Sequence, residues 1–310
     1  MKVAILGGCG AMGGLFGGWL ARAGLDVTLV DVSTEAVETI NRSGLRIDED
    51  GSTATIQVAA SSQPEEIGTV DLILTFVKCY HTADAVSAAL PMMHADTVVL
   101  SLQNGWGNAE RIAEIAGRGR VVAGLTYHSC TLVAPGHLRH AGSGPTHIGE
   151  LDGTSTPRLQ AVSDALASAG FEVSVSAHIV DEIWKKLALN VCTLPTAALL
   201  GFPAHQLNQH EGTRDTMRAL LSEVGQVARA QGIQLDEAER WEAITGLLDR
   251  AVGARGSMVQ DVEARRPTEI DVINGAIVTA GRRYDIATPF NSAMVWMIQS
   301  LQESYRDRQA

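Results

Sequence analysis

The chain has little of several features that mark particular classes of protein. It holds four cysteines (Cys9, Cys79, Cys130 and Cys192), and no two share the CxxC spacing of a zinc or redox site, so we expect a reduced, cytoplasmic protein. Basic charge is scarce. The net charge of −11 argues against a nucleic-acid or anionic-membrane partner. We find no run of about 18 apolar residues that would predict a membrane span, and no signal peptide.

The composition that remains is that of a globular protein with a sizeable core. Apolar residues make up 45% of the chain and charged residues 19%, and a length of 310 residues favours two domains. Strand-like and helical runs alternate in the first half, whereas the pattern after about residue 178 is helical throughout. We therefore predict an α/β Rossmann-type dinucleotide-binding domain over residues 1–178. An all-α domain for substrate binding or dimerisation would follow over 179–310.

A Gly-rich loop follows the first predicted strand, Lys2 to Leu6. In the dinucleotide-binding fingerprint, the first glycine permits a tight turn, the second lets the backbone approach a pyrophosphate, and the third lets helix and strand pack closely. The register is open, because Gly7 could take the place of the first glycine. The helix that follows offers its N-terminal N–H groups to the anion. The predicted cofactor-binding residues of this loop are Gly8, Gly10, Ala11, Met12 and Gly13.

Asp31 ends the second predicted strand, Asp26 to Val30, and bears on the choice of cofactor. A carboxylate at this point accepts hydrogen bonds from the ribose hydroxyls of NAD and repels the 2′-phosphate of NADP. We therefore favour NAD(H) and leave NADP(H) open. The alternative is a solvated turn or helix N-cap aspartate.

Lys78 and Asn104 follow the next two apolar strands, Val70 to Val77 and Thr97 to Leu102. Ligands of open α/β sheets bind beyond the carboxyl ends of the strands, so both are candidate cofactor-binding residues. The alternatives are a surface lysine at a strand end and a plain Asn-Gly turn. Four histidines lie further on, at spacings that match no zinc pattern, so we interpret them as loop residues and predict no metal: His128, His137, His140 and His147.

The stretch from Ile183 to Leu194 reads as a mostly apolar helix that nevertheless carries Lys186 and Asn190 on one face. A buried ammonium is costly unless it has a purpose. Lys186 is either a lysine that reaches solvent or Glu182 near the start of the helix, or an active-site lysine. Pro195 should kink or end this helix.

Near the C-terminus, Thr268 is a plausible N-cap of another helix. Glu269 would lie in its first turn, where an acidic side chain is favourable for the helix alone. Ile270, Ile273 and Ile277 would form its apolar face.

Together these motifs resemble the ketopantoate reductase (2-dehydropantoate 2-reductase) family over essentially the whole chain. The matching parts are the N-terminal Gly loop, Lys78, Gln103-Asn104-Gly105, Trp184-Lys185-Lys186-Leu187 with Asn190, Ser257-Met258 with Gln260-Asp261, and Arg266-Pro267-Thr268-Glu269-Ile270-Asp271 with Asn274-Gly275. The resemblance implies a Rossmann domain followed by a helical domain. It also implies reduction of a 2-oxo acid with a nicotinamide cofactor, in pantothenate biosynthesis.

The resemblance also implies roles for individual residues. Lys186 matches the catalytic lysine and Glu269 its partner acid, while Asn104 and Asn190 match amides on the substrate and cofactor side. Ser257 matches a hydroxyl that helps to hold the substrate carboxylate. Hydride addition leaves charge on the ketone oxygen, and a positioned ammonium can stabilise that charge and supply the proton.

The chain departs from the family pattern where two substrate-side asparagines are replaced by Leu194 and Ala254. Their loss favours a small-molecule substrate with fewer or differently placed hydroxyls. Our leading hypothesis is an NAD(P)H-dependent reductase of ketopantoate or a related 2-oxo acid. The alternatives are an NAD-dependent dehydrogenase of a different 2-hydroxy acid, which Asp31 favours, and a non-catalytic dinucleotide sensor. Whether the protein forms a homodimer is left open.

Overall fold

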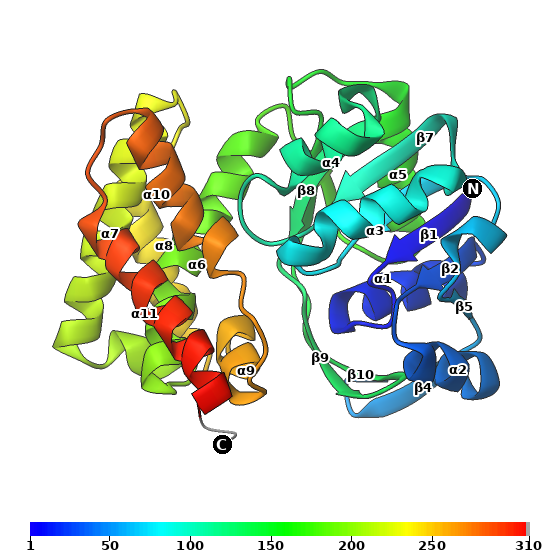
Figure 1. Cartoon of the computed structure of the whole chain (residues 1–310), viewed down its shortest axis with the longest axis horizontal. Helices are drawn as coiled ribbons and strands as arrows, with labels where there is room; N and C mark the ends of the chain where they lie inside the picture. The colour runs from blue at the N-terminus through cyan, green and yellow to red at the C-terminus, as the bar shows by residue number, and fades with distance from the viewer. Residues whose placement is uncertain (308–310) are drawn as a thin grey trace. The chain divides into compact units, whose positions relative to one another are not determined.

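The computed structural model describes residues 1–307, which form two compact units (Figure 1). The first comprises Met1–Gln103 and Asn108–Ile179, and the second comprises Asn104–Gly107 and the chain from Val180 onward. The predicted fold class, a Rossmann-type α/β part followed by an all-α part, is confirmed. Within the described residues, no helix has the length and apolar character that crossing a membrane requires.

An eight-stranded sheet forms the centre of the first unit. Its order, β12-β11-β8-β7-β6-β1-β2-β5, reverses direction between β1 and β6, which is the topological switch point of a doubly wound sheet. All neighbours are parallel except β8 and β11. The strands are β1 (Lys2–Leu6), β2 (Asp26–Val30), β5 (Ala59–Ser61), β6 (Val70–Thr75), β7 (Met93–Ser101), β8 (Val121–Thr126), β11 (Thr146–Gly149) and β12 (Val173–Val175).

Helices connect these strands, and the apolar runs of β1, β6 and β7 are buried between them, as parallel strands require. The ends of two helices show local sequence signals: Ser33 and Thr156 each accept a backbone N–H as N-cap of α2 and α5, respectively. The helices of the first unit are α1 (Ala11–Arg22), α2 (Thr34–Ser43), α3 (Thr82–Ala89), α4 (Asn108–Ala116) and α5 (Pro157–Ser168).

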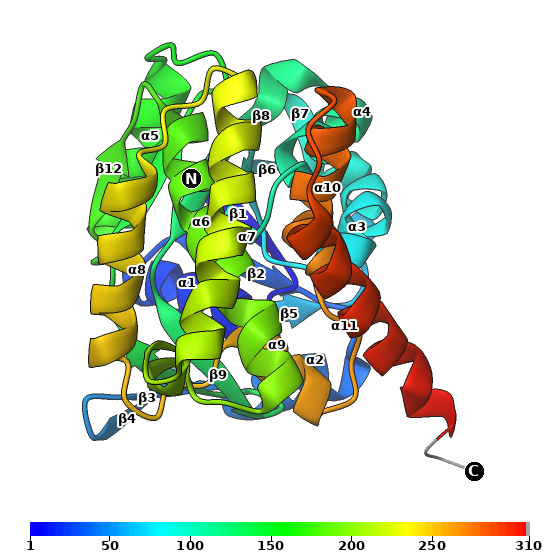
Figure 2. The same cartoon turned by 90° about the vertical axis from the view of Figure 1, so that its left-hand side faces the viewer.

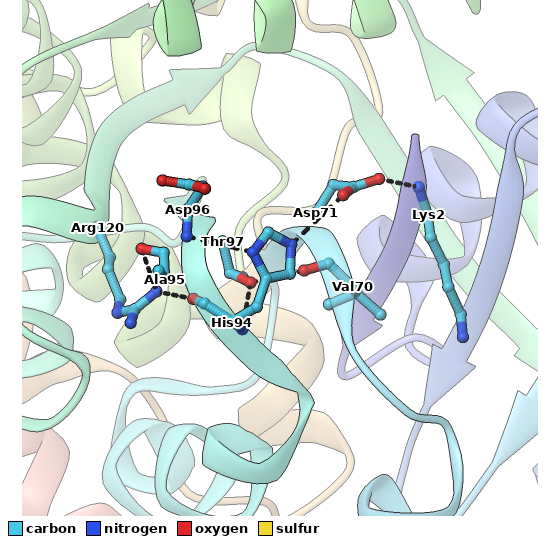
Figure 3. Close-up of polar contacts among 8 residues, drawn as sticks. All are labelled: Lys2, Val70, Asp71, His94, Ala95, Asp96, Thr97 and Arg120. Atoms are coloured by element: carbon cyan, nitrogen blue, oxygen red, sulfur yellow. Dashed lines mark hydrogen bonds and ion pairs between the residues drawn. The ribbon is translucent and has the colours of Figure 1, made fainter.

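The amino-terminal edge of the sheet is locked by its own polar contacts (Figure 3). The carboxylate of Asp71 accepts the backbone N–H of Lys2 at 2.7 Å, which holds the pKa of Asp71 below its usual range, and lies 3.4 Å from His94 Nε2. Thr97 Oγ1 accepts the His94 backbone N–H at 2.9 Å, and the Arg120 guanidinium donates to the His94 carbonyl. These contacts join three strands at one edge, while the opposite, carboxyl edge carries the Gly loop.

A second sheet of four strands, in the order β4-β3-β10-β9, covers the other side of α1. Because α1 is enclosed by both sheets, it is buried almost all round. An added Cβ would run into Leu29 of β2 at Gly17, and would meet Leu45 at 2.9 Å at Gly18. The strands are β3 (Leu45–Glu49), β4 (Ser52–Ile56), β9 (Ser129–Ala134) and β10 (His137–Gly142).

The prediction that the four histidines are loop residues is wrong for three of them. His137 and His140 belong to β10 and His147 to β11; only His128 lies between strands. His140 donates or accepts on both ring nitrogens, at 2.8 Å from Glu49 Oε1 and 3.0 Å from His128 Nδ1. Burial, with His140 beside it, lowers the pKa of His128 to about 4. His140 pairs with Glu49 of the neighbouring strand β3 and with His128. Glu49 is far away in the sequence, so the residues next to His140 in the chain could not reveal this pairing.

The second unit is helical (Figure 2). Its long helix α7 contacts α8, α10 and α11, and its apolar core includes Trp184, the largest fully buried side chain of the described residues. The helices are α6 (Ile179–Leu200), α7 (Glu211–Ala230), α8 (Glu237–Arg250), α9 (Ser257–Glu263), α10 (Asn274–Arg283) and α11 (Pro289–Asp307).

Of the two outcomes expected at Pro195, a kink or an end of the helix, the helix does not end there, because α6 continues to Leu200. A second expectation about a helix boundary is wrong. The helix expected from Thr268 begins only at Asn274, and Glu269 instead precedes a short 3₁₀ turn, Ile270–Val272. That turn is held by a long-range bond, from the Trp106 N–H to the Val272 carbonyl.

Candidate active site

The Gly-rich loop joins β1 to α1 at the carboxyl edge of the sheet. The left-handed turn expected at Gly8 lies one residue earlier, at Gly7, whose φ is 75°. The backbone N–H groups of Gly7 and Gly8 both donate to the Val30 carbonyl, at 2.9 and 3.0 Å. Gly8 instead packs against β2, where an added Cβ would come within 2.7 Å of Leu29 Cα. The open question of register is therefore decided in favour of Gly7 for the turn.

The remaining residues of the loop fit a dinucleotide pyrophosphate. Gly10 is the N-cap of α1 and has no side chain to cap the helix, so the loop presents bare backbone there. Ala11 and Met12 open the helix, where N–H groups have no intrahelical acceptor and can bind an anion. An added Cβ at Gly13 would collide with the Gly7 carbonyl, so only glycine allows this close packing of helix on loop.

Asp31 lies at the carboxyl end of β2 and is anchored to this loop. Its Oδ2 accepts the Cys9 N–H at 3.1 Å, and its Oδ1 accepts the Ser33 N–H at 3.1 Å. Ser33, and not Asp31, is the N-cap of α2, so the alternative of an N-cap aspartate is wrong. The next side chain, Val32, is 94% exposed. The strand end therefore presents a fixed carboxylate and an uncharged neighbour.

Lys78 lies half-buried just beyond β6, next to the Gly loop. An added Cβ at Gly7 would lie 2.9 Å from the Val77 N atom, which shows how closely the two segments approach. The Gln103 side-chain amide donates to the Val77 carbonyl at 2.7 Å and so holds the Lys78 segment from the end of β7. Gln103 was not predicted to have a role of its own; a polar side chain directly after a buried strand was the available signal.

In the helical unit, Lys186 and Asn104 come together. The Lys186 ammonium donates to Asn104 Oδ1 at 2.9 Å. Glu182, the alternative partner considered for Lys186, is instead bonded to Lys185 at 2.8 Å. The neighbouring lysines of α6 therefore differ in their surroundings: one forms a surface ion pair and the other contacts an amide of the Asn104–Gly107 loop.

The charge state of Lys186 is set by two opposing influences. Burial lowers the pKa of its ammonium from 10.5 to about 8, although the nearby charge of Glu269 acts in the raising direction. Glu269 is itself buried, at the start of the 3₁₀ turn Ile270–Val272. An amine with a pKa this close to neutrality can both give and take a proton near pH 7.

Two aromatic side chains hold the Asn104 loop in the helical unit. Trp106 donates its backbone N–H to the Val272 carbonyl at 2.8 Å. Its ring lies 5.8 Å from the ring of Trp184, which precedes Lys186 by two residues on α6. Gly105 approaches the same carbonyl so closely that an added Cβ would lie 2.5 Å from it. The loop thus connects α6 to the segment that carries Glu269.

The other candidate substrate residues lie on α6 and α9. Asn190 is buried one turn after Lys186. Ser257 is exposed as the first residue of α9. Leu194 lies against Gly256, the residue before Ser257, since an added Cβ at Gly256 would be 2.8 Å from Leu194 Cδ2.

The structure thus brings Lys186, Asn104 and Glu269 together and places Leu194 beside the start of α9. Among residues 1–307, no three His, Cys, Asp or Glu side chains are arranged as they would be around a metal ion.

Comparison with known proteins identifies relatives along the whole chain. The family "Ketopantoate reductase PanE/ApbA" matches residues 3–153, and its C-terminal family matches 178–302. The 2-dehydropantoate 2-reductase of Halobacterium salinarum is 32% identical over 292 residues, which cover 93% of this chain and 95% of that protein.

Solved structures agree in fold. The PanE/ApbA family ketopantoate reductase of Ralstonia eutropha JMP134 superposes with a TM-score of 0.91 at 32% identity, covering 99% of this chain and 100% of that one. A D-mandelate dehydrogenase in ternary complex with NADH and anilino(oxo)acetate superposes with a TM-score of 0.92 at 28% identity, covering 98% and 99%. The chain therefore belongs to the ketopantoate reductase family of oxidoreductases.

Proposed function

We propose that this protein is a nicotinamide-dependent reductase of a 2-oxo acid in which Lys186 donates the proton. The observation that carries the proposal is the Lys186 ammonium, bonded to Asn104 and influenced by Glu269, with a pKa lowered to about 8. A cofactor-binding sensor would not need a proton donor of this kind.

The cofactor, when bound, supplies the hydride that is added to the ketone carbon. We assign its binding to the first unit, through the Gly7–Gly13 loop, Asp31 and Lys78. The Lys186 ammonium would stabilise the charge that develops on the ketone oxygen and then protonate it. Asn104 would orient that ammonium through the bond described above.

The helical unit would hold the rest of the substrate. Glu269 would keep Lys186 charged, and Asn190 and Ser257 would bind the 2-oxo acid, the hydroxyl of Ser257 taking its carboxylate. Asn190 and Ser257 are uncharged donors, so they can bind a substrate carboxylate without adding a second positive charge to that of Lys186.

We infer that the preferred cofactor is NAD(H). The carboxylate of Asp31 is fixed by two backbone N–H groups, so it cannot readily turn away from a 2′-phosphate, and the exposed Val32 supplies no compensating positive charge. A D-mandelate dehydrogenase that is similar to this chain was solved with NADH, which supports a nicotinamide cofactor; the preference for NAD(H) rests on Asp31 and Val32.

We further infer that the substrate side chain is poor in hydroxyl groups. Leu194 presents an apolar side chain next to the start of α9, where the family pattern has an amide, and Ala254 removes a second one. Oxidation of an apolar 2-hydroxy acid with NAD is therefore a second candidate function, favoured by Asp31 and by the likeness to the D-mandelate dehydrogenase.

A substrate panel assayed with NADH and NADPH tests this function. The sharpest pair is ketopantoate and the analogue that lacks only its hydroxyl group. An apolar pocket rejects an added hydroxyl by at most about 100-fold, whereas a site built to bind the hydroxyl rejects the analogue by about 10⁴-fold. We expect kcat/KM for the analogue to equal or exceed that for ketopantoate, and Leu194→Asn to move the ratio towards ketopantoate. A strong preference of the unmodified enzyme for ketopantoate would refute the apolar pocket, and no turnover of any 2-oxo acid would refute the function.

The pH dependence should differ in sign between the two reaction directions. Reduction needs the ammonium form of Lys186, so its kcat/KM should fall as the pH rises through about 8; oxidation needs the neutral amine and should rise over the same range. In Glu269→Gln the charge that raises this pKa is gone, so both midpoints should move to lower pH. Rate profiles in both directions measure this, and a midpoint near that of an ordinary lysine would contradict it.

A further inference from the structure

We propose that Asn274 is a positioning residue for the reaction: its side-chain amide ties the start of α10 to the Lys186 helix and so fixes Lys186 relative to Glu269. The inference rests on the proposed role of Lys186. The Asn274 amide bonds Val191 and Asn291, so it acts through the backbone that carries Lys186 and Glu269.

The tie begins with a proline in the middle of a helix. Pro195 lies within α6 and has no N–H, so the carbonyl of Val191, one turn earlier, lacks its normal helical donor. The Asn274 amide Nδ2 donates to this carbonyl at 3.2 Å, although the two residues are 83 positions apart. Both are fully buried, so water could not replace the bond at low cost. A side chain of α10 thus supplies the hydrogen-bond donor that the Val191 carbonyl of α6 lacks.

The Asn274 amide is itself held in place by a buried chain of hydrogen bonds. Its Nδ2 also donates to Asn291 Oδ1 at 3.0 Å, and the Asn291 amide donates to Glu223 Oε2 at 2.7 Å. The Glu223 carboxylate accepts the backbone N–H groups of Phe290 and Asn291 as well, at the start of α11, where a negative charge is favourable. The chain joins α7, α11, α10 and α6, and it leaves the Asn274 side chain little freedom to rotate.

The position of Asn274 in the sequence connects this tie to the site. Only the 3₁₀ turn and Ile273 separate it from Glu269, and that turn receives the Trp106 N–H on its Val272 carbonyl. The Glu269 segment is therefore attached to α6 at two points, through Trp106 at the last residue of the turn and through Asn274 just after it. Displacements of about 1 Å at a catalytic group can cost about 100-fold in rate. These attachments between α6 and the Glu269 segment, which we call the frame, should therefore affect turnover directly.

A direct titration of Lys186 tests the proposal without needing substrate. The chain has four lysines, Lys2, Lys78, Lys185 and Lys186, so NMR of isotopically labelled lysine side chains can follow each one. In Asn274→Ala we expect α6 to loosen, water to reach the Lys186 ammonium, and its midpoint to rise from about 8 by roughly half a unit or more. We also expect kcat/KM to fall about 10-fold to 100-fold, with NADH affinity unchanged within about twofold.

Pro195→Ala separates positioning from simple stability. Alanine at 195 restores the backbone N–H for the Val191 carbonyl but not the bond to Asn291, so the double variant Pro195→Ala/Asn274→Ala should recover part of the Tm that Asn274→Ala loses. It does not restore the link between α6 and α10. We therefore expect kcat/KM and the Lys186 titration to stay perturbed in the double variant. It also carries the test if Asn274→Ala alone does not fold.

Asn208→Ala is the matched control, because it removes an asparagine whose amide bonds Asp249 at an exposed position of the same unit. It should leave the Lys186 titration and kcat/KM unchanged. The proposal is overturned if Asn274→Ala leaves both readouts at their original values, or if the double variant recovers them together with Tm. Failure of the proposed function is a separate result: the unmodified protein would then turn over no 2-oxo acid, while the titration would still report on the frame.

Discussion

Lys186→Ala is expected to lower kcat by about 10³-fold while NADH binding stays within a few-fold of normal. The loss removes the one group of the Lys186–Asn104–Glu269 cluster that can both stabilise the charge on the ketone oxygen and protonate it, and general acid catalysis contributes about 10² to 10⁴ in rate. Cofactor binding is assigned to the first unit, so it should survive. Steady-state kinetics and fluorescence titration with NADH measure the two effects.

The neighbouring lysine supplies a matched control for this prediction. Lys185→Ala removes the same charge from the adjacent position of α6, where it forms a partly exposed pair with Glu182. Pairs of this kind contribute about 0 to 1 kcal/mol to stability, so kcat should remain close to normal. Near-normal turnover in Lys186→Ala would remove the proton donor from the proposed mechanism, and equal losses in both variants would show a structural effect on α6.

Exchanging the charge at the end of β2 should have the second largest effect. In Asp31→Ser/Val32→Arg, the fixed carboxylate is replaced by a small hydroxyl, and an arginine occupies a position whose side chain is 94% exposed. Removing a repulsive charge and adding a phosphate-binding one should each contribute a few kcal/mol at most, because the site is close to solvent. We expect the ratio of kcat/KM for NADH to that for NADPH to fall by about 100-fold or more.

Asp26 offers the matched control for the cofactor exchange. It carries the same charge at the opposite end of the same strand and is exposed, so Asp26→Ser should leave the cofactor ratio unchanged. The measurement is kcat/KM with each cofactor at a saturating concentration of the best substrate from the panel. An unmodified enzyme that already prefers NADPH would show that our interpretation of Asp31 is wrong.

Several parts of the fold and of the candidate site follow from short stretches of sequence. The apolar run of β1, the Gly loop and the strand that ends at Asp31 are recognisable because each depends on residues close together in the chain. The helical stripe that carries Lys186 and Asn190 is local in the same sense, and a charge on an otherwise apolar face is a sufficient signal to single it out. Leu194 and Ala254 likewise raise the question of the substrate through their positions in the sequence alone.

Other features depend on contacts between distant residues and were therefore missed. The small sheet pairs β3 with β10, and this pairing brings Glu49 and Asp48 opposite histidines that resemble loop residues in the sequence. The turn glycine is Gly7, whose φ is 75°, while Gly8 packs against Leu29 of β2; each glycine is required by a contact with a segment distant in the sequence. Glu269 lies outside its expected helix, before a 3₁₀ turn whose Val272 carbonyl accepts the N–H of Trp106, a residue more than 160 positions earlier.

The sequence by itself determined the class of fold and the cofactor-binding motif, which depend on side-chain periodicity and on spacing within single elements. It also singled out Lys186 as a charge on an apolar helix, and the resemblance to the family implied its role as the proton donor. The tertiary structure alone decided how far α6 extends and what surrounds Lys186. The carbonyl that Pro195 leaves without a donor is satisfied by Asn274, and the lowered pKa of Lys186 arises from burial by segments far away in the chain. Both are long-range effects, because hydrogen-bond donors and desolvation act through space and not along the sequence.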